Sequence, residues 1–442
     1  MESDIADPSL AEAGRARIRW AGRAMPVLAT LGERFRGQRP FAGAGIAACL
    51  HVTAETAGLV RLLTTGGGRV RLAASNPLST QDDVAAALAA EDGVTVFARA
   101  GEGLDSYEAH IRMALGDEGP AGGTGPAGGT GPARPSAARQ PGPDLVIDDG
   151  GDLIDMLHRH RPDLLSGVRG GCESTTTGVT RLRRMAAAGR LAFPVVAADV
   201  SATRRMLDNF SGTGQSVLDG LLRATNLLLA GRVVVVAGYG PCGAGIAERA
   251  RGLGAQVIVT EVDPVRALRA ALNGFRVLPM TQAASIGEVF ITATGNRDVI
   301  TGEHLALMRD GALLANAGHF DVEIDVRALA GAAAEVTPGI RPHADEYLMP
   351  DGRRLILLAE GRVVNLVAAE GNPAPVMDLS FAVQALALAW LAGGQAGLEP
   401  GVHDVPRQVD LEVARLELES MGVRIDTMTP VQDEYLSAWR RG

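Results

Sequence analysis

The stretch from Gly231 to Pro264 constrains the fold most, because it reads as a strand, a glycine-rich turn, a helix and a second strand in direct succession. It runs GRVVVVAGYGPCGAGIAERARGLGAQVIVTEVDP, with apolar runs at VVVVA and QVIVT. Its glycines Gly238, Gly240 and Gly243 have the spacing G-x-G-x-x-G. Glycines at this spacing let backbone amides and a helix N-terminus approach a pyrophosphate. The sequence therefore predicts a parallel α/β unit with a dinucleotide site at the turn.

The residue that ends the second strand indicates which dinucleotide is bound. Glu261 lies where an acid accepts hydrogen bonds from the adenosine ribose and repels a 2′-phosphate, which favours NAD over NADP. Pro241 and Cys242 fill variable positions, and proline is tolerated in the first turn of a helix. A glycine turn in an ordinary α/β protein is the alternative, but the complete unit in register argues for NAD.

The first third of the chain alternates strand and helix patterns as well. Strand-like runs occupy residues 43–52, 67–75 and 144–152, and residues 55–65, ETAGLVRLLTT, follow a helical pattern. Such alternation predicts an α/β fold with a second parallel sheet. ITATGN and NAGHFDVEID each follow an apolar run, which makes His319 a candidate at the ligand-binding end of the later sheet.

Composition favours a small-molecule partner. The 442 residues are 46% hydrophobic and carry a net charge of −9, so no general basic field attracts nucleic acid or anionic lipid. The apolar stretch FAVQALALAWLAGG is judged too short to span a bilayer, and the charged N-terminus lacks an apolar signal segment. No membrane or nucleic-acid partner is expected.

Two further features bear on organisation and location. Residues 120–143 form a Gly/Pro/Ala repeat, which predicts a disordered surface insertion. Cys49, Cys172 and Cys242 are too few and too far apart for a disulfide framework or a zinc cluster, which points to a reducing cytoplasm. Asp148, Asp149 and Asp152 could cap a turn or hold a metal, but no compact ligand cluster appears and no catalytic metal is expected.

An ordered series of motifs resembles the S-adenosylhomocysteine hydrolase family over nearly the whole chain. The motifs are, in order, ACLHVTAET, SNPLSTQDD, DDGGDL, ESTTTGVTRL, LDNFSGTGQS, VAGYGPCGAG, VTEVDP, GHFDVEIDV, LLAEGRVVNL and the VM of NPAPVM. The resemblance implies two doubly wound Rossmann-like domains: a substrate domain of residues 1–199 and 366–410, and an inserted NAD domain of residues 200–365. A short C-terminal segment, 411–442, would follow, and the protein would form a homo-oligomer, either a tetramer or a dimer.

The resemblance also implies the chemistry. In that family bound NAD oxidises the ribose 3′-hydroxyl of an adenine nucleoside, a base removes the acidified C4′ proton, and the 5′ substituent leaves by β-elimination. Water then adds to the 4′,5′ alkene, and the ketone is reduced again. The partner implied is an adenine nucleoside.

Carried over residue by residue, the resemblance assigns three groups of side chains. The catalytic group is His51, Asp149, Arg204, Asp208 and His319. The substrate-binding group is Thr53, Glu55, Ser174, Asn209, Asn372 and Met377. The cofactor-binding group is Gly238, Gly240, Gly243, Glu261, Thr175, Thr176, Thr177, Thr294, Asn316 and Asn365. Taken alone, His51 could equally be a satisfied core histidine at the end of a strand.

Five positions depart from the family pattern. The family's second glutamate, which grips the ribose hydroxyls, is Ser174 here, and its catalytic lysine is Arg204. Its nicotinamide-side cysteine is Thr213, the asparagine after its Asp-Pro signature is Arg266, and its gate histidine is Asn372. The chain also ends without the family's Lys-Pro and His-Tyr-Arg-Tyr tail. Ser174 and Arg204 replace groups that handle the sugar in that family.

The stretch SATRRMLDNF, residues 201–210, contains two adjacent arginines, Arg204 and Arg205. Adjacent arginines are usually a solvated charge pair, and that reading stands for Arg205. Arg204 aligns with the family lysine, but a guanidinium can only donate hydrogen bonds and stabilise an alkoxide. Proton transfer would then pass to Asp208 or His319, and Ser174 would leave room beside the sugar.

Three functions are compatible with these residues. The favoured one is an NAD-dependent nucleoside dehydratase that forms a 4′,5′-unsaturated product in nucleoside-antibiotic metabolism. The first alternative is S-adenosylhomocysteine hydrolase itself. The second is a non-catalytic regulator that binds NAD.

Overall fold

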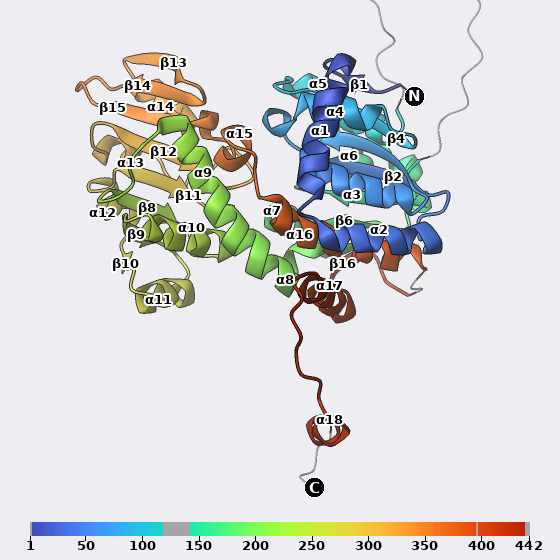
Figure 1. Ribbon diagram of the computed structural model, residues 1–442. Coiled ribbons are helices and arrows are strands. Elements are labelled where there is room, and N and C mark those ends of the chain that lie inside the picture. Colours follow the sequence, from blue (N-terminus) through green and yellow to red (C-terminus); the bar gives the residue numbers. More distant parts are fainter. Residues whose placement is uncertain (1, 118–141, 395–396, 438–442) are drawn as a thin grey trace, which may run out of the picture.

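The computed structural model describes residues 2–117, 142–394 and 397–437, in which two eight-stranded sheets form the centres of two lobes (Figure 1). The first sheet has the strand order β1-β4-β3-β2-β5-β6-β7-β16, and every neighbouring pair is parallel. Its strands are β1 (Asp4–Ile5), β2 (Gly45–Leu50), β3 (Arg69–Ala74), β4 (Val94–Ala98), β5 (Leu145–Asp148), β6 (Gly170–Glu173), β7 (Pro194–Ala197) and β16 (Gly401–Asp404). The predicted insertion at 120–143 lies almost entirely outside the described residues.

The second sheet has the order β10-β9-β8-β11-β12-β15-β14-β13 and is parallel up to β15, after which β14 and β13 run antiparallel. Its strands are β8 (Val233–Ala237), β9 (Gln256–Thr260), β10 (Arg276–Val277), β11 (Val289–Thr292), β12 (Ala312–Asn316), β13 (Glu335–Arg341), β14 (Ala344–Leu348) and β15 (Arg354–Leu358). The expected α/β class with two doubly wound sheets is confirmed.

Helices cover both faces of each sheet, as connections between parallel strands require. The first lobe contains α1 (Ala11–Gly22), α2 (Pro26–Gln38), α3 (Ala54–Thr65), α4 (Asp82–Ala89), α5 (Leu104–Ala114), α6 (Asp152–His160), α7 (Thr176–Ala187), α16 (Ala374–Ala392) and α17 (Arg407–Ser420). The second contains α9 (Thr213–Thr225), α10 (Pro241–Gly252), α11 (Pro264–Leu272), α12 (Met280–Ala284), α13 (Gly302–Leu307), α14 (Val326–Ala332) and α15 (Val364–Val367). The last helix, α18 (Pro430–Ser437), projects away from both lobes (Figure 1).

The apolar sequences of the central strands follow from burial of these strands on both faces. All six residues of β2 are buried, as expected for a strand covered on both faces. The register sets Cys49 of β2 opposite Asp148 of β5, and Asp148 opposite Glu173 of β6. Consequently the loops that follow these three strands open at the same edge of the sheet.

The helix α16 corrects one expectation from the sequence. It spans 19 residues, because Pro373 and the segment APVMDLS begin the helix before the apolar stretch, so it is not too short to cross a membrane. Among the described residues it is the one helix that is long and apolar enough to do so, and 78% of its apolar window is buried inside the protein. It packs against α2 and α3 in the core of the first lobe.

The chain crosses between the lobes twice. After β7 it passes through α8 (Ala202–Arg204) and an eight-residue π-helix, η5 (Arg205–Gly212), into α9; it returns from α15 into α16. Asp410 of α17 fixes the start of the first crossing, because its carboxylate accepts hydrogen bonds from the backbone of Ala202 and the side chain of Ser201. π-Helical turns are rare and often occur at functional sites. The boundaries at residues 200 and 365 stay predictions.

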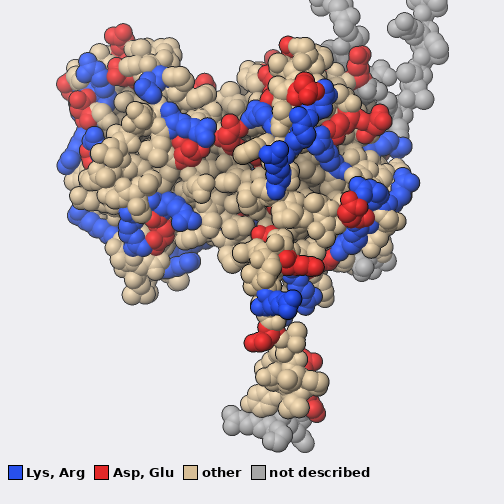
Figure 2. Space-filling model, in the orientation of Figure 1, with Lys and Arg blue, Asp and Glu red and all other residues tan. Residues whose placement is uncertain are grey.

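Charged side chains of both signs are interspersed over the two lobes on the face shown in Figure 2. All 42 basic residues of the chain are arginine, because the sequence contains no lysine.

Candidate active site

The candidate site lies where the carboxyl ends of strands from both sheets face each other. His51 follows β2, Asp149 follows β5 and Ser174 follows β6, whereas His319 follows β12 of the second lobe. The rings of His51 and His319 lie 5.8 Å apart between centroids, in an edge-to-face arrangement. Strand ends of an α/β sheet are where ligands usually bind, and the fold brings these four residues together at such an end. Their roles stay predictions.

A cavity of about 150 Å³ lies at this junction. Its lining consists of His51, Thr53, Glu55, Thr56, Asp149, Ser174, Thr175, Arg204, Asp208, Asn365, Leu366, Glu370, Asn372, Met377, Phe381 and Gln384. Most of the residues predicted for catalysis and substrate binding are therefore brought together. His319 and Asn209 do not line the cavity, although the ring of His319 lies against that of His51.

A glycine permits the approach of the two lobes at His319. A Cβ atom on Gly150 would come within 2.6 Å of His319 Nε2, and Gly150 has a φ of +111°. Burial lowers the pKa of His51 to about 4. Burial and, to a smaller extent, repulsion from a protonated His51 lower the pKa of His319 to about 4. Both imidazoles are therefore neutral at pH 7 and able to accept a proton.

The pKa of the Asp149 carboxyl group is shifted upwards, opposite to that of the two imidazoles. Burial raises its pKa, and the hydrogen bond from Ser174 and the charge of Arg204 offset that rise only in part. The Ser174 hydroxyl donates to Asp149 Oδ1. The Asp149 carboxyl group and the two neutral imidazoles therefore lie together as groups that could exchange protons with a bound molecule.

Arg204 is held inside the site and is not a solvated residue. Its Nε atom donates to Asp208 Oδ2 over 3.0 Å, and its Nη1 atom donates to the Ser174 carbonyl oxygen. Burial acts to lower the pKa of Arg204, but the charges of Asp208 and Asp149 outweigh it and the pKa rises. The guanidinium therefore keeps its charge. Arg205 instead donates from Nε to the Asp199 carbonyl oxygen.

Asp208 binds protein groups through both of its oxygens. Oδ1 accepts from Asn372 Nδ2 at 2.5 Å, and Oδ2 accepts from Arg204 and from the hydroxyl of Ser380. The expectation that Asp208 could replace the family lysine as a base therefore needs correction. With three donors on its oxygens, it orients Arg204 and Asn372.

Three of the residues predicted to bind substrate, Thr53, Glu55 and Met377, lie at the start of α3 and on α16. Thr53 caps α3, and its Oγ1 atom accepts from the Thr56 amide at 3.4 Å. Burial raises the pKa of Glu55. Met377 of α16 lines the same cavity. Their contact with a base stays a prediction.

Two amides connect the surroundings of the cavity at the lobe junction to the second lobe. Asn209 Nδ2 donates to Cys242 Sγ over 3.6 Å, which links the π-helix to the glycine turn. Asn365 Nδ2 donates to Ser216 Oγ over 3.1 Å, and Ser216 donates to Asn372 Oδ1 over 2.7 Å. The Oδ1 atoms of Asn209 and Asn365 are buried and have no partner among the described residues.

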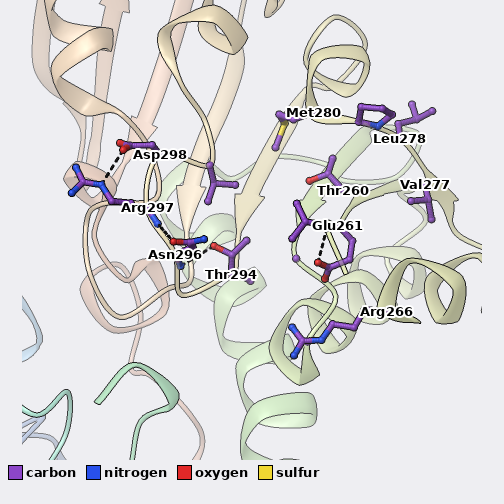
Figure 3. A pocket seen from close by; sticks show the side chains of 16 residues that line it. Thr260, Glu261, Arg266, Val277, Leu278, Met280, Thr294, Asn296, Arg297 and Asp298 are labelled. Atoms are coloured by element: carbon purple, nitrogen blue, oxygen red, sulfur yellow. Dashed lines mark hydrogen bonds and ion pairs between the residues drawn. The ribbon is translucent and has the colours of Figure 1, made fainter. Parts of the chain in front are cut away.

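The glycine turn fits a dinucleotide. Gly238 has a φ of +97°, and a Cβ atom on Gly243 would lie 2.0 Å from the Gly238 carbonyl oxygen. Gly240 caps the N-terminus of α10, where backbone amides are free to bind phosphate. A cavity of about 660 Å³ opens beside the turn (Figure 3), and its lining includes Gly238, Gly240, Thr260, Glu261, Arg266, Thr294 and Asn296.

Glu261 and Arg266 lie on the same side of that cavity (Figure 3). Glu261 Oε2 accepts from the Tyr239 amide at 2.7 Å, and Oε1 accepts from the amides of Val262 and Asp263. The acid therefore fixes the turn, and its bond to a ribose stays a prediction. The exposed Arg266 has its Nη1 atom 3.8 Å from the position of a Cβ on Gly240.

The loops that carry the predicted cofactor-binding residues Thr294 and Asn316 are held by buried carboxylate and amide groups. Glu323 accepts from the Thr294 amide at 3.0 Å and from the Thr294 hydroxyl at 2.6 Å. Asn316 is fully buried, and its Nδ2 atom donates to the carbonyl oxygens of Phe320 and Gly361, each at 2.9 Å. Asn316 therefore shapes the loop that carries His319.

The three threonines at the start of α7 differ in position. Thr175 caps the helix and donates to Glu173 Oε1 over 2.8 Å, and Thr176 is exposed. Thr177 faces the second lobe, because its Oγ1 atom lies 3.7 Å from the position of a Cβ on Gly295. A cofactor contact by these threonines stays a prediction.

Sequence reasoning missed several residues that shape the site. They are Glu173, Ser216, Glu323, Glu370, Ser380 and Gln384. For Ser380 and Gln384 a signal existed, because they are polar residues within an otherwise apolar helix. Within the described parts of the chain, no group of three or more His, Cys, Asp or Glu side chains could hold a metal ion.

Comparison with known proteins adds independent findings. Residues 2–163 match a sequence model described as S-adenosyl-L-homocysteine hydrolase, and residues 209–371 match its NAD binding domain. An adenosylhomocysteinase of Aquifex aeolicus is 52% identical over 442 residues, which cover 100% of both chains. An S-inosyl-L-homocysteine hydrolase of Methanopyrus kandleri is 50% identical over 441 residues, 100% of this chain and 98% of that one. Together with the glycine turn, the match of residues 209–371 to the NAD binding domain identifies NAD as the cofactor.

Proposed function

Because the chain belongs to the S-adenosyl-L-homocysteine hydrolase family, we propose that it is an NAD-dependent nucleoside dehydratase. The substrate would be an adenine nucleoside with a modified sugar, and the product a 4′,5′-unsaturated nucleoside of the kind found in nucleoside antibiotics. Hydrogen from C4′ and the hydroxyl group from C5′ would leave together as water.

One observation carries the proposal. The groups suited to elimination, His51, Asp149 and His319, adjoin one another, while the two positions expected to grip an ordinary ribose carry different residues. Ser174 donates to Asp149, and Arg204 donates to the Ser174 carbonyl oxygen. The sugar therefore meets a hydroxyl and a fixed guanidinium where the family pattern has a carboxylate and an amine. This difference favours a sugar other than that of S-adenosylhomocysteine.

The residues divide the steps between them. Bound NAD supplies reversible hydride removal at the sugar C3′ atom. Arg204 donates hydrogen bonds to the 3′ oxygen and stabilises negative charge there, because it cannot lose its proton. His319 and His51, neutral at pH 7, accept the protons of the 3′-hydroxyl and of C4′. Asp149, which lies beside both imidazoles, delivers a proton to the departing 5′ oxygen.

Hydrolysis of S-adenosylhomocysteine is the second candidate. It is favoured by relatives named adenosylhomocysteinase, including that of Aquifex aeolicus at 52% identity. The chain contains no lysine at all, so an arginine at position 204 is also compatible with that reaction. A non-catalytic NAD-binding regulator is less well supported, because such a protein has no need of buried acid and base groups at the lobe junction.

The test compares three nucleosides with the NAD-loaded protein. They are S-adenosylhomocysteine, adenosine, and an adenine nucleoside that carries an additional hydroxymethyl group on C1′. We expect the third to lose one water by mass spectrometry and S-adenosylhomocysteine to release homocysteine only slowly. Rapid homocysteine release without dehydration would refute the proposal in favour of the hydrolase.

We further propose that the protein acts in the cytoplasm as a homo-oligomer, a tetramer or a dimer. Light scattering on the purified NAD-loaded protein tests the assembly, and a monomer at micromolar concentration would contradict it.

A further inference from the structure

A third cavity lies in the first lobe, apart from the two described above. It has a volume of about 640 Å³ and is formed by α6, α7 and the short helix η3 (Pro162–Gly167). None of its lining residues lines the cavity at the lobe junction or the cavity beside the glycine turn. The lining consists of Gly151, Asp155, His158, Arg159, Leu165, Arg181, Leu182, Arg184, Met185 and Arg190.

This lining is basic, although the protein as a whole is acidic. It contains four arginines and one carboxylate, whereas the chain carries a net charge of −9. The carboxylate, Asp155, is already paired, because Arg159 Nε donates to its Oδ1 atom over 2.9 Å. His158 adds no charge at pH 7, since burial lowers its pKa. A concave surface of one charge sign concentrates counter-ions, so the cavity is expected to attract anions.

Two of its arginines are free to bind such an anion. Arg181 is not one of them, because its Nη1 atom donates to the Gly150 carbonyl oxygen and to Asp152 Oδ1, each at 2.6 Å. Arg184 and Arg190 differ, since their side chains make no hydrogen bond or ion pair with any described residue. A single exposed arginine without a partner is ordinary. Two that line one cavity repel each other, and an anion between them would remove that repulsion.

The remaining wall of the cavity is apolar. Leu165, Leu182 and Met185 supply it, and Leu182 is only 2% exposed. Small-molecule sites typically combine such a wall with a few polar groups that fix the orientation of the ligand. The volume is close to the 660 Å³ of the cavity beside the glycine turn. The cavity therefore suits a molecule with one strongly anionic group and an apolar body.

We propose that this cavity binds a phosphate monoester, with Arg184 and Arg190 on the phosphate and an aromatic or aliphatic ester group against Leu165, Leu182 and Met185. A guanidinium group donates two parallel hydrogen bonds to a phosphate, which makes arginine well suited to this ligand. A phosphate monoester carries about 1.5 to 2 negative charges at pH 7, which matches two free arginines. The site does not depend on the reaction proposed for the lobe junction.

Calorimetric titration of the NAD-loaded protein at fixed ionic strength tests the ligand class. The probes are phenyl phosphate, inorganic phosphate and benzyl alcohol. We expect phenyl phosphate to bind about tenfold more tightly than inorganic phosphate, and benzyl alcohol not to bind measurably. The double variant Arg184→Gln, Arg190→Gln should weaken binding of phenyl phosphate at least about tenfold.

Arg183→Gln is the matched control, because Arg183 is an exposed residue of the same helix that does not line the cavity. It should leave the affinity for phenyl phosphate unchanged. An equal loss in Arg183→Gln would show a general effect of surface charge and would overturn the proposal. Equal affinity for phenyl phosphate and inorganic phosphate would also overturn it, because the apolar wall would then have no role.

Labelled methionine methyl groups show where the probe binds. Met185 lines the proposed cavity, Met377 the cavity at the lobe junction, and Met280 the cavity beside the glycine turn. Met185→Leu, Met377→Leu and Met280→Leu assign the three NMR signals. We expect phenyl phosphate to shift the Met185 signal and to leave the other two in place. A shift confined to Met377 or Met280 would put the probe in a cavity already described and would contradict the proposal.

Neither measurement involves turnover. If no nucleoside is dehydrated but phenyl phosphate shifts the Met185 signal, the proposed reaction fails and the phosphate monoester site stands.

Discussion

The glycine turn of the second lobe is formed by backbone, whereas the sugar cluster, which we define as Asp149, Ser174, Arg204 and Asp208, is formed by side chains. The turn from Gly238 to Gly243 is made of backbone, and a single added Cβ on Gly243 would overlap a carbonyl oxygen. The sugar cluster is made of side chains: Asp149, Ser174 and Arg204 form a chain of hydrogen bonds that ends on Asp208. The turn has the G-x-G-x-x-G spacing of the family, whereas the cluster departs from the family pattern at Ser174 and Arg204.

The difference shows which half of the site is free to change. A site made of backbone accepts almost no substitution, because glycine is needed where φ is positive or where another backbone group is in contact. A site made of side chains can exchange one hydrogen-bonded set for another, provided that every buried polar group keeps a partner. Cofactor binding is therefore expected to be rigidly retained and sugar specificity to vary.

The largest effect should come from the turn. Gly243→Ala places a Cβ 2.0 Å from the Gly238 carbonyl oxygen, so α10 must move away from the strand end. We expect the affinity for NAD to fall by more than about a hundredfold. NAD released on denaturation after extensive dialysis is the measurement. Gly252→Ala, in the same helix with no atom within 4 Å, should retain NAD, and equal retention by both variants would contradict the account.

A second glycine should have a nearly comparable effect on the reaction. Gly150→Ala would force His319 Nε2 away from the first lobe, because the added Cβ would lie 2.6 Å from it. We expect turnover to fall about a hundredfold while NAD binding is unchanged. Gly352→Ala, at a φ of +89° with no atom within 4 Å, controls for backbone strain alone. Similar losses in the two variants would show that strain, and not the position of His319, is responsible.

The contrast also explains how much the sequence could predict. The fold class, the NAD turn and the place of His319 followed from periodicity and glycine spacing, which report backbone geometry directly. His51 and Asp149 were assigned through the resemblance to the family. The occupation of Asp208 by three donors did not, because Ser380 and Asn372 approach it from distant parts of the chain. The length of α16 was underestimated, since its first turns contain proline and polar residues.

Arg204→Lys sharpens the comparison within the sugar cluster. It introduces the only lysine of the chain, and a desolvated ammonium group can release a proton where a guanidinium cannot. We expect release of homocysteine from S-adenosylhomocysteine to rise about tenfold, as one charge-assisted interaction is worth in a transition state.

Arg205→Lys is the matched control, because Arg205 donates to the Asp199 carbonyl oxygen and does not line the cavity. In each variant an amine-specific reagent followed by peptide mapping reports a single lysine. No gain from Arg204→Lys would mean that the arginine already serves the family reaction.

The smallest effect concerns stability and pH. Glu173, beneath the sugar cluster, accepts from the amides of Gly150 and Thr175, and burial raises its pKa from the usual 4.5 to about 8. Because the folded state binds this proton more tightly than the unfolded state, the stabilisation is complete below about pH 4.5 and is lost as the pH rises through about 8.

The melting temperature of the native protein should therefore fall between pH 5 and pH 8, and Glu173→Gln should make that fall smaller by about 5 °C. Glu108→Gln, at an exposed position of α5, should leave the slope as it is in the native protein. An identical slope in native protein and Glu173→Gln would show that Glu173 is ionised in the folded state.

The most direct test of elimination is hydrogen exchange at C4′. The NAD-loaded protein is incubated with adenosine and sugar-modified adenosines in deuterated water, and deuterium at C4′ is measured together with absorbance of NADH. We predict exchange at C4′ with transient NADH, and suppression of the exchange in Asp149→Asn and His319→Ala. Formation of NADH without C4′ exchange, for every nucleoside tried, would show that the protein is only a 3′-oxidoreductase and would contradict the account.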